Sequence, residues 1–240
     1  MAGIKKYKAI LFDLDGTLLP LDYDTFLKKY FSLLVAELAP FGYSPKELTD
    51  AVWAGTAAMV KNDGKMKNEA VFWNVMEEML GCDVTEIKAT CDAFYEGTFM
   101  QAKEIVGENP LAKDTVKLAK KVAGKVVLAT NPLFPMVAQK ARMSWVGLSA
   151  DDFDIVTSYE TDSFSKPNYK YYLDICERLD VSPSECLMIG NDEKEDCFAA
   201  TLAGMDAYLV EDNIIECEEH PWAGLRGSFE MLYNYLEILD

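Results

Sequence analysis

The sequence contains a single histidine, His220, among its 240 residues. This residue ends the acidic stretch 216–220, which is typical of a surface loop, so we do not expect a site built on histidine. The six cysteines include no Cys-x-x-Cys pair and no zinc-type spacing. We therefore interpret all six as reduced thiols, mostly in the core.

Positive charge is also scarce. The chain has 23 basic and 40 acidic residues, which gives a formal net charge of -17. Such a field repels nucleic acids and anionic membrane surfaces, so we expect neither as a partner. An anionic substrate such as a phosphate ester would need local positive charge or a metal ion.

Long apolar runs are absent. None follows the three lysines of residues 1–8, so the sequence predicts neither a signal peptide nor a membrane anchor, and a cytoplasmic location follows by default. Half of the residues are nevertheless hydrophobic, enough to bury a sizeable core.

The chain changes its pattern along its length. Residues 8–12 form a short element that is continuously apolar after Lys8, as expected of a strand buried on both faces. Apolar residues at helical spacing then predict four helices between residues 20 and 105, one of which begins at a capping box, Ser44 to Glu47. We predict no strand in that region.

After residue 109, helices and strands alternate. Strands are predicted at 126–130, 154–157, 187–189 and 207–210. Helices are predicted at about 111–123, 133–145, 167–179, 193–203 and 229–239. This alternation predicts an α/β fold, a Rossmann-like parallel sheet with helices on both faces. We expect residues 1–19 and 106–240 to form this core and residues 20–105 to form an all-helical domain inserted into it.

Polar residues follow four of the predicted strands, at the edge where open parallel sheets bind their ligands. The side chains that we expect to converge there are Asp13, Asp15, Thr130, Asn131, Lys166, Asp192 and Asp196.

Four of these side chains are carboxylates. Two like charges ~4 Å apart repel by roughly 4 kcal/mol at an effective dielectric of 20, so such a cluster either holds protons or binds a hard cation. Carboxylates, a backbone carbonyl and waters suit Mg²⁺. We therefore predict a magnesium site formed by Asp13, Asp15, Asp192 and Asp196.

Donors to an anion are expected beside these acids. Lys166 adds positive charge, and the Thr130 hydroxyl and the amides near Asn131 can donate to phosphate oxygens. Anion donors beside a hard cation describe a phosphoryl-transfer centre. Asp13 is then the natural nucleophile, and Asp15 would protonate the leaving alkoxide and deprotonate the attacking water.

Four motifs, in order along the chain, resemble those of the haloacid dehalogenase-like (HAD) hydrolase superfamily. They are Asp13-Leu14-Asp15-Gly16-Thr17-Leu18, Thr130-Asn131, Lys166-Pro167 and Gly190-Asn191-Asp192-x-x-x-Asp196. The resemblance implies a Mg²⁺-dependent phosphatase that hydrolyses a small phosphate monoester through an aspartyl-phosphate intermediate. It also implies that residues 20–105 are a helical cap.

Individual roles follow from the same resemblance. Asp13 resembles the nucleophile and Asp15 the acid/base. Thr130 resembles the hydroxyl that contacts phosphate, and Lys166 the lysine that steadies the phosphoaspartyl state. We expect Asp15, Thr130, Asn131 and Lys166 to contact the substrate. In the cap, aromatic residues such as Phe26, Tyr30 and Trp73, together with Lys61, could reach the substrate, although plain packing is the favoured interpretation of the aromatics.

The fourth motif departs from its commonest form, which begins Gly-Asp. Here Asn191 stands between Gly190 and Asp192, which leaves open whether Asp192 or Asp196 binds the ion directly. Asp196 would bind through water or pair with the motif lysine, Asn191 could be a supporting donor, and we expect Glu195 to be solvated.

Other functions fit parts of this pattern. A sugar phosphomutase uses the same core, a receiver domain uses similar residues on a shorter chain, and a non-catalytic binding protein could keep the fold. The acid at Asp15 favours phosphate chemistry over dehalogenation. Both a monomer and a homodimer are compatible with the sequence.

Overall fold

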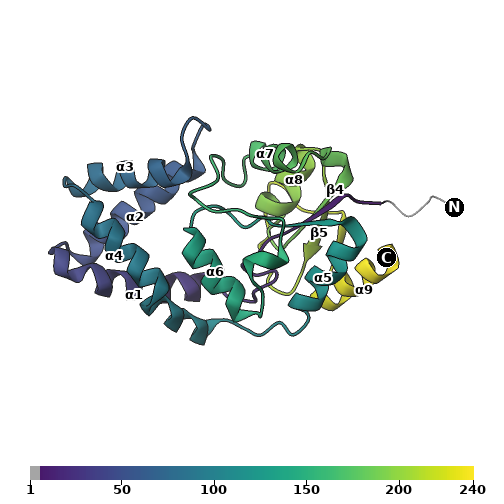
Figure 1. Ribbon diagram of the computed structural model, residues 1–240, viewed down its shortest axis with the longest axis horizontal. Coiled ribbons are helices and arrows are strands. Elements are labelled where there is room, and N and C mark those ends of the chain that lie inside the picture. The colour runs from purple at the N-terminus through teal and green to yellow at the C-terminus, as the bar shows by residue number, and fades with distance from the viewer. Residues whose placement is uncertain (1–5) are drawn as a thin grey trace.

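The computed structural model describes residues 6–240, so the first five residues of the predicted core lie outside the described part (Figure 1). A six-stranded parallel sheet has the order β3-β2-β1-β4-β5-β6. The strands are β1 (Ala9–Phe12), β2 (Lys125–Leu128), β3 (Ile155–Val156), β4 (Cys186–Gly190), β5 (Asp206–Val210) and β6 (Leu225–Gly227).

The strand β1 is central. Its last residue, Phe12, lies opposite Leu128 of β2 and Ile189 of β4. Because all three strands run in the same direction, the segments that follow them leave the sheet at the same edge. The fully buried β1 and β4 are continuously apolar, as strands covered on both faces must be.

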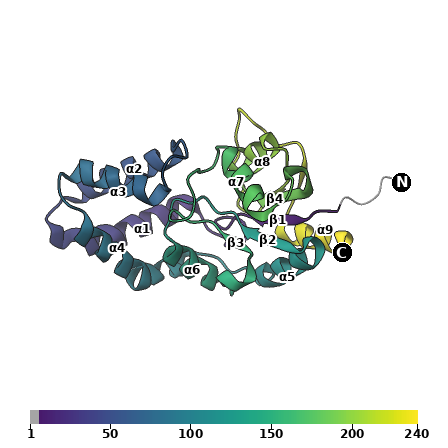
Figure 2. The same cartoon turned by 45° about the horizontal axis from the view of Figure 1, so that its top comes forward.

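Helices cover both faces of the sheet (Figures 1 and 2). On one face, Ile10 and Phe12 share a core with α5 (Ala112–Ala123), α6 (Met136–Trp145) and α9 (Phe229–Leu239). On the other face, Ala9 and Leu11 share a core with α7 (Lys170–Leu179), the π-helical η5 (Glu193–Phe198) and α8 (Ala199–Leu202). The predicted Rossmann-like α/β fold is confirmed.

The segment between β1 and α5 is helical. It contains α1 (Tyr23–Leu38), η1 (Ala39–Phe41), α2 (Pro45–Val60), α3 (Asn68–Leu80), α4 (Thr85–Glu96) and η2 (Thr98–Ile105). All of its residues are described, and none belongs to a named strand of the sheet. The capping box at the start of α2 is present, because the Ser44 N–H donates to the Glu47 carboxylate at 2.8 Å.

The two ends of this helical segment lie side by side. The N–H of Gly107 donates to the carbonyl of Pro20 at 2.7 Å. The segment extends to one side of the sheet (Figure 2), and its buried aromatic residues belong to the same core cluster as α5 and α6. It is therefore packed on the α/β part rather than separated from it.

Some element boundaries differ from the expectation. The helix predicted at 133–145 begins at Met136, after Pro135, and the one predicted at 167–179 begins at Lys170. The helix predicted at 193–203 divides into η5 and α8. Two short turns complete the chain, η3 (Ala150–Asp152) and η4 (Pro183–Glu185). Across residues 6–240, no helix has both the length and the apolar character that a bilayer crossing requires.

Candidate active site

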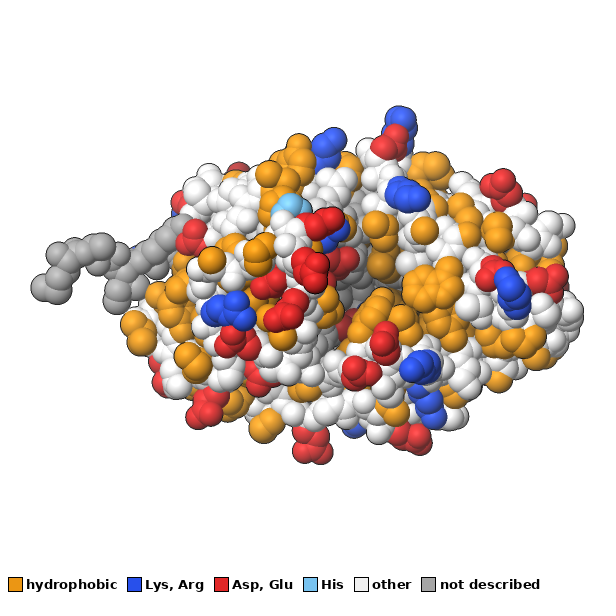
Figure 3. Space-filling view, turned by 180° about the vertical axis from the view of Figure 1, so that it is seen from behind, with side chains coloured by type: hydrophobic (Ala, Val, Ile, Leu, Met, Phe, Trp, Pro, Cys, Tyr) orange, Lys and Arg blue, Asp and Glu red, His pale blue; other side chains and the backbone are white. Residues whose placement is uncertain are grey.

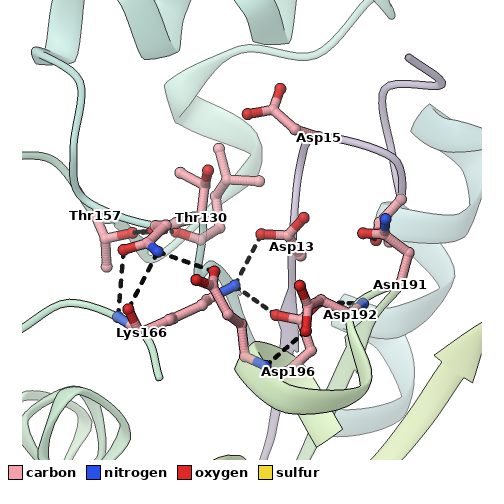
Figure 4. A network of polar contacts seen from close by, with 12 residues as sticks. Asp13, Asp15, Thr130, Thr157, Lys166, Asn191, Asp192 and Asp196 are labelled. Carbon is pink, nitrogen blue, oxygen red and sulfur yellow. Dashed lines mark hydrogen bonds and ion pairs between the residues drawn. The ribbon is translucent and has the colours of Figure 1, made fainter. Parts of the chain in front are cut away.

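A buried lysine joins two of the predicted acids (Figure 4). Asp13 immediately follows β1, and Lys166 Nζ lies 2.8 Å from Asp13 Oδ1 and 2.6 Å from Asp196 Oδ1. The Lys166 side chain is 1% exposed. A buried ammonium requires such partners, because an unpaired charge in the interior is strongly unfavourable. Three motifs that lie far apart in the sequence therefore meet at one point.

The acids outnumber the base at this point. Burial, together with the carboxylates of Asp196 and Asp15, raises the pKa of Asp13 to about 8 against the opposing charge of Lys166. Burial alone would lower the pKa of Lys166, but the charges of Asp13 and Asp196 outweigh it and raise that pKa well above its usual value. Lys166 therefore stays protonated. A bound cation would stabilise the remaining excess of negative charge on the carboxylates.

Both carboxylate oxygens of Asp196 are engaged. Oδ1 accepts from Lys166, and Oδ2 accepts from the N–H of Asp192 at 3.0 Å. Gly190 permits this arrangement, because a Cβ there would lie 2.1 Å from Asp196 Oδ2. Of the two roles that the sequence left open for Asp196, the structure shows the contact with Lys166.

Asp192 lies at the start of η5. Its Oδ1 accepts the N–H groups of Lys194 and Glu195, both at 2.8 Å. Burial, and next the charge of Asp196, raise the pKa of Asp192, although these hydrogen bonds oppose the shift. Asp192 and Asp13 line the same cavity, so they face one space.

Asp15 has a different partner. Its Oδ2 accepts a hydrogen bond from Nη1 of Arg142, a fully buried residue of α6 whose Nη2 donates to Gln139 Oε1. The guanidinium carbon of Arg142 lies 4.4 Å from the centre of the Phe134 ring. Figure 4 shows the Asp15 carboxylate pointing away from Asp13 and Lys166.

The four carboxylates of the predicted magnesium site do not form a preformed cluster in the described residues. Asp15 is paired with Arg142, and both oxygens of Asp196 are used. Within residues 6–240, no group of three acidic, histidine or cysteine side chains is arranged to hold an ion by itself. Asp13 and Asp192 line the cavity with Asp15, Glu195 and Asp196, and their hydrogen bonds to described residues use Oδ1 alone. This pair suits Mg²⁺, which keeps several waters and needs only one or two protein carboxylates.

Asn131 joins the loops after β2, β3 and β4. Its Oδ1 accepts the Lys166 N–H at 3.2 Å, and its Nδ2 donates to Glu195 Oε2 at 2.9 Å. Glu195, which we expected to be solvated, is half-buried, and burial raises its pKa to about 7. The adjacent Thr130 is buried, and its carbonyl accepts from the Thr157 hydroxyl at 2.7 Å.

Asn191 lines the cavity and also supports the first motif. Its Oδ1 accepts from the Thr17 hydroxyl at 3.0 Å, and its Nδ2 donates to the Asn213 carbonyl at 2.7 Å. Gly16 has φ +84°, and a Cβ on it would lie 2.3 Å from Asn191 Nδ2. The turn after Asp15 therefore requires glycine for its backbone conformation and for space.

Arg142 has no place in the four motifs and was not predicted from the sequence. Helical spacing offers a signal, since Arg142 lies one turn after the buried Ala138 and next to the buried Met143. A charged residue on the buried side of a helix needs a partner, and Asp15 is that partner here.

A cavity of about 290 Å³ is lined by the four predicted acids, Asp13, Asp15, Asp192 and Asp196, together with Thr130, Asn131, Tyr23 and Phe134. Figure 3 shows a hollow between the helical segment and the sheet, with acidic side chains gathered on the sheet side and hydrophobic ones on the helical side. The cavity has room for a phosphate ester beside an ion.

A model of the haloacid dehalogenase-like hydrolases matches residues 7–204, most of the chain. The chain belongs to the haloacid dehalogenase-like hydrolases. This membership confirms the resemblance carried by the four motifs, and it makes the protein an enzyme of hydrolase type.

Two relatives of this HAD-like hydrolase are phosphatases. Glyceraldehyde 3-phosphate phosphatase of Methanothermobacter thermautotrophicus is 36% identical over 66 residues, 28% of this chain and 29% of that enzyme. Ribulose-1,5-bisphosphate 5-phosphatase of Halopiger xanaduensis is 23% identical over 207 residues, 85% of this chain and 84% of that enzyme.

A solved structure agrees with the fold. The 2-haloacid dehalogenase of Pseudomonas syringae pv. Tomato superposes with a TM-score of 0.64 at 22% identity, covering 98% of this chain and 100% of that one. At that identity the similarity establishes the fold of the HAD-like hydrolase, and the chemistry has to be argued from its own site.

Proposed function

We propose that this HAD-like hydrolase is a Mg²⁺-dependent phosphatase that hydrolyses a small phosphate monoester through a phosphorylated Asp13. The proposal rests above all on the position of Asp13. This residue follows the central strand, pairs with Lys166 and lines the cavity. Two relatives named for the hydrolysis of small phosphate esters support the same class of reaction.

The chemistry divides into two transfers. A carboxylate oxygen of Asp13 attacks phosphorus, the bond from phosphorus to the ester oxygen breaks, and Asp15 gives its proton to the leaving alcohol. Water then attacks the phosphorus of the phosphoaspartate while Asp15 takes a proton from it, which releases inorganic phosphate and restores Asp13. Lys166, the Thr130 hydroxyl and the amides near Asn131 hold the phosphoryl oxygens.

Asp13 and Asp192 are the carboxylates that would hold Mg²⁺, with waters completing the shell. When bound, the ion neutralises charge between Asp13 and the phosphate and favours the ionised nucleophile. The surplus of acid at the site, with the raised pKa values of Asp13 and Asp192, fits this cation. Asp196 would orient Lys166 rather than bind the ion.

Residues 20–105 would act as the cap, and residues 1–19 and 106–240 as the catalytic core. Tyr23 of α1 lines the catalytic cavity, so the helical segment already forms part of its wall. Closure of such a wall over the ester excludes water until the alcohol has left.

A screen of small phosphate monoesters with Mg²⁺, run beside Asp13→Asn, tests the proposal. We expect the wild type to release phosphate and Asp13→Asn to lose more than about a thousandfold in kcat, with an unchanged circular dichroism spectrum. Asp114→Asn, on the exposed surface of α5, is the matched control and should keep full activity. Turnover by folded Asp13→Asn would overturn the mechanism.

A further inference from the structure

A second cavity, of about 60 Å³, lies inside the helical segment, among α1, α2, α3 and α4 and the loop 133–135. No Lys, Arg, Asp, Glu or His is among the described residues that line it, although 26% of the chain is charged. We call it the apolar chamber. Tyr30 and Trp73, two of the cap residues singled out by the sequence, line it, whereas Lys61 is exposed and does not.

The apolar chamber adjoins the catalytic cavity. Three residues, Tyr23, Leu133 and Phe134, line both spaces. The Phe134 ring lies 4.4 Å from the guanidinium carbon of Arg142 and 5.4 Å from the ring centre of Tyr30. A molecule whose phosphate sits beside Asp13 therefore has a hydrophobic space next to it, bounded by the same aromatic ring.

Four polar groups of the apolar chamber form two pairs with one another. The hydroxyls of Tyr30 and Tyr95 are 2.8 Å apart, and Trp73 Nε1 lies 3.4 Å from the Tyr159 hydroxyl. Burial raises the pKa of the Cys91 thiol to about 12, so this wall stays uncharged at neutral pH. A hydroxyl group entering the chamber would exchange water for a wall that is mostly apolar.

This favours one kind of leaving group. Each methylene buried in an apolar space improves binding by about fourfold, whereas a buried hydroxyl without a partner weakens it on the order of tenfold or more. A second phosphate would be excluded far more strongly, because an unpaired buried anion is very unfavourable.

We propose that the apolar chamber receives the alcohol part of the substrate, so that the enzyme selects phosphate monoesters of small aliphatic or aromatic alcohols over sugar phosphates and bisphosphates. The inference rests on the proposed function. The reaction is unchanged: the phosphoryl group passes to Asp13, and the apolar alcohol leaves with a proton from Asp15.

The decisive comparison uses two esters of equal carbon length, n-propyl phosphate and glycerol 3-phosphate, with the Mg²⁺-loaded wild type. We expect kcat/KM at least about tenfold higher for the propyl ester, and a rise of about fourfold per methylene from methyl to propyl phosphate. Equal values, or a preference for glycerol 3-phosphate, would overturn the inference and leave the phosphatase assignment intact. Hydrolysis of no ester at all would overturn both.

Filling the apolar chamber with a larger side chain gives an independent test. Thr56 lines the chamber from α2, and its hydroxyl donates to the Val52 carbonyl at 2.8 Å. Thr49, one heptad earlier, makes the same bond to Pro45 at 2.8 Å but does not line the chamber. We expect Thr56→Phe to lower the ratio of kcat/KM for n-butyl over methyl phosphate by about tenfold, and Thr49→Phe to keep that ratio. An unchanged ratio in Thr56→Phe would contradict the proposal.

Discussion

Arg142 donates a hydrogen bond to Asp15 from a fully buried position, across 127 residues of sequence. Asp13, two residues before Asp15, is held instead by Lys166. Each acid of the Asp-x-Asp motif thus has its own buried cation, and the two carboxylates are kept apart. This separation suits a nucleophile and an acid/base that act on opposite sides of the same phosphorus–oxygen bond.

Replacement of Arg142 by Gln should reduce turnover more than binding. Without the guanidinium, Asp15 loses its orientation, and a misplacement of about 1 Å can cost about a hundredfold in rate. We expect kcat to fall by about tenfold to a hundredfold while KM changes less, measured by steady-state kinetics on folded protein. Arg178→Gln, which removes the pairing of Arg178 with Asp162, is the control, because neither residue lines the catalytic cavity. An unchanged kcat in Arg142→Gln would exclude a positioning role.

Removal of divalent ions should stop hydrolysis, and added Mg²⁺ should restore it. The physical reason is the surplus of acid around Asp13 and Asp192, which only a cation balances. Titration of activity with Mg²⁺ should show that Asp192→Asn needs at least about tenfold more ion for half-maximal activity. Rates that resist a chelator would contradict the metal assignment.

Asp196→Asn should behave differently from Asp192→Asn. Both carboxylate oxygens of Asp196 accept hydrogen bonds, one from Lys166 and one from the Asp192 N–H. Replacement of this carboxylate by an amide therefore weakens a buried ion pair. We expect a loss of about 3 kcal/mol in the free energy of unfolding, measured with urea. A variant with unchanged stability and a large shift in Mg²⁺ requirement would instead make Asp196 a direct ligand.

Gly16→Ala and Gly81→Ala separate backbone strain from crowding. Both glycines have positive φ, +84° and +65°, but only Gly16 has a neighbour within reach of a new Cβ, Asn191 Nδ2 at 2.3 Å. Each variant should lose about 1 kcal/mol of stability from strain. Gly16→Ala should also lose more than about tenfold in kcat/KM, because the turn after Asp15 must shift. Equal activity in the two variants would show that the turn tolerates the shift.

Glu193 should give a pH-dependent contribution to stability. Its carboxylate accepts the N–H groups of Cys217 and Trp222 at 2.7 and 3.0 Å, and the bond from Cys217, more than any other interaction, lowers the pKa of Glu193. A depressed folded-state pKa stabilises the protein fully above the unfolded value of about 4.3, and this stabilisation is lost as the pH falls through the folded value.

We therefore expect Glu193→Gln to lose about 1–2 kcal/mol of unfolding free energy at pH 7 and to approach the wild type below pH ~4, in urea titrations at several pH values. Glu211→Gln, which removes one partner of an exposed pair with Arg226, should change stability little at either pH. A Glu193→Gln deficit that is the same at low and neutral pH would rule out the ionised carboxylate as its source.

The sequence predicted most of the sheet because a strand buried on both faces is continuously apolar. β1 and β4 have this property throughout, and β2 and β5 have it after their first residues, Lys125 and Asp206. The helix α9 coincides with the predicted range 229–239. The strand β6 was not predicted, because its three residues lie at the sheet edge and Leu225 and Arg226 are exposed. A short edge strand is determined by its neighbour β5 rather than by its own pattern.

The part of the candidate site that follows the ends of neighbouring parallel strands was predictable from the sequence, because those ends lie at one edge of the sheet. Asp13, Lys166 and Asp196 meet because their motifs follow strands of one parallel sheet. The pairing of Asp15 with Arg142 was not predictable in this way, since it depends on how α6 is rotated against the sheet. The half-burial of Glu195 depends likewise on η5 being π-helical, and local sequence does not specify that geometry.

The contact between Pro20 and Gly107 has a consequence for how this architecture can change over time. A stretch of chain whose entry and exit touch can be lengthened, shortened or exchanged without moving the strand before it or the helix after it. Under the proposed function, selectivity would be altered through this excursion while the phosphoryl-transfer residues that follow the strands are inherited unchanged.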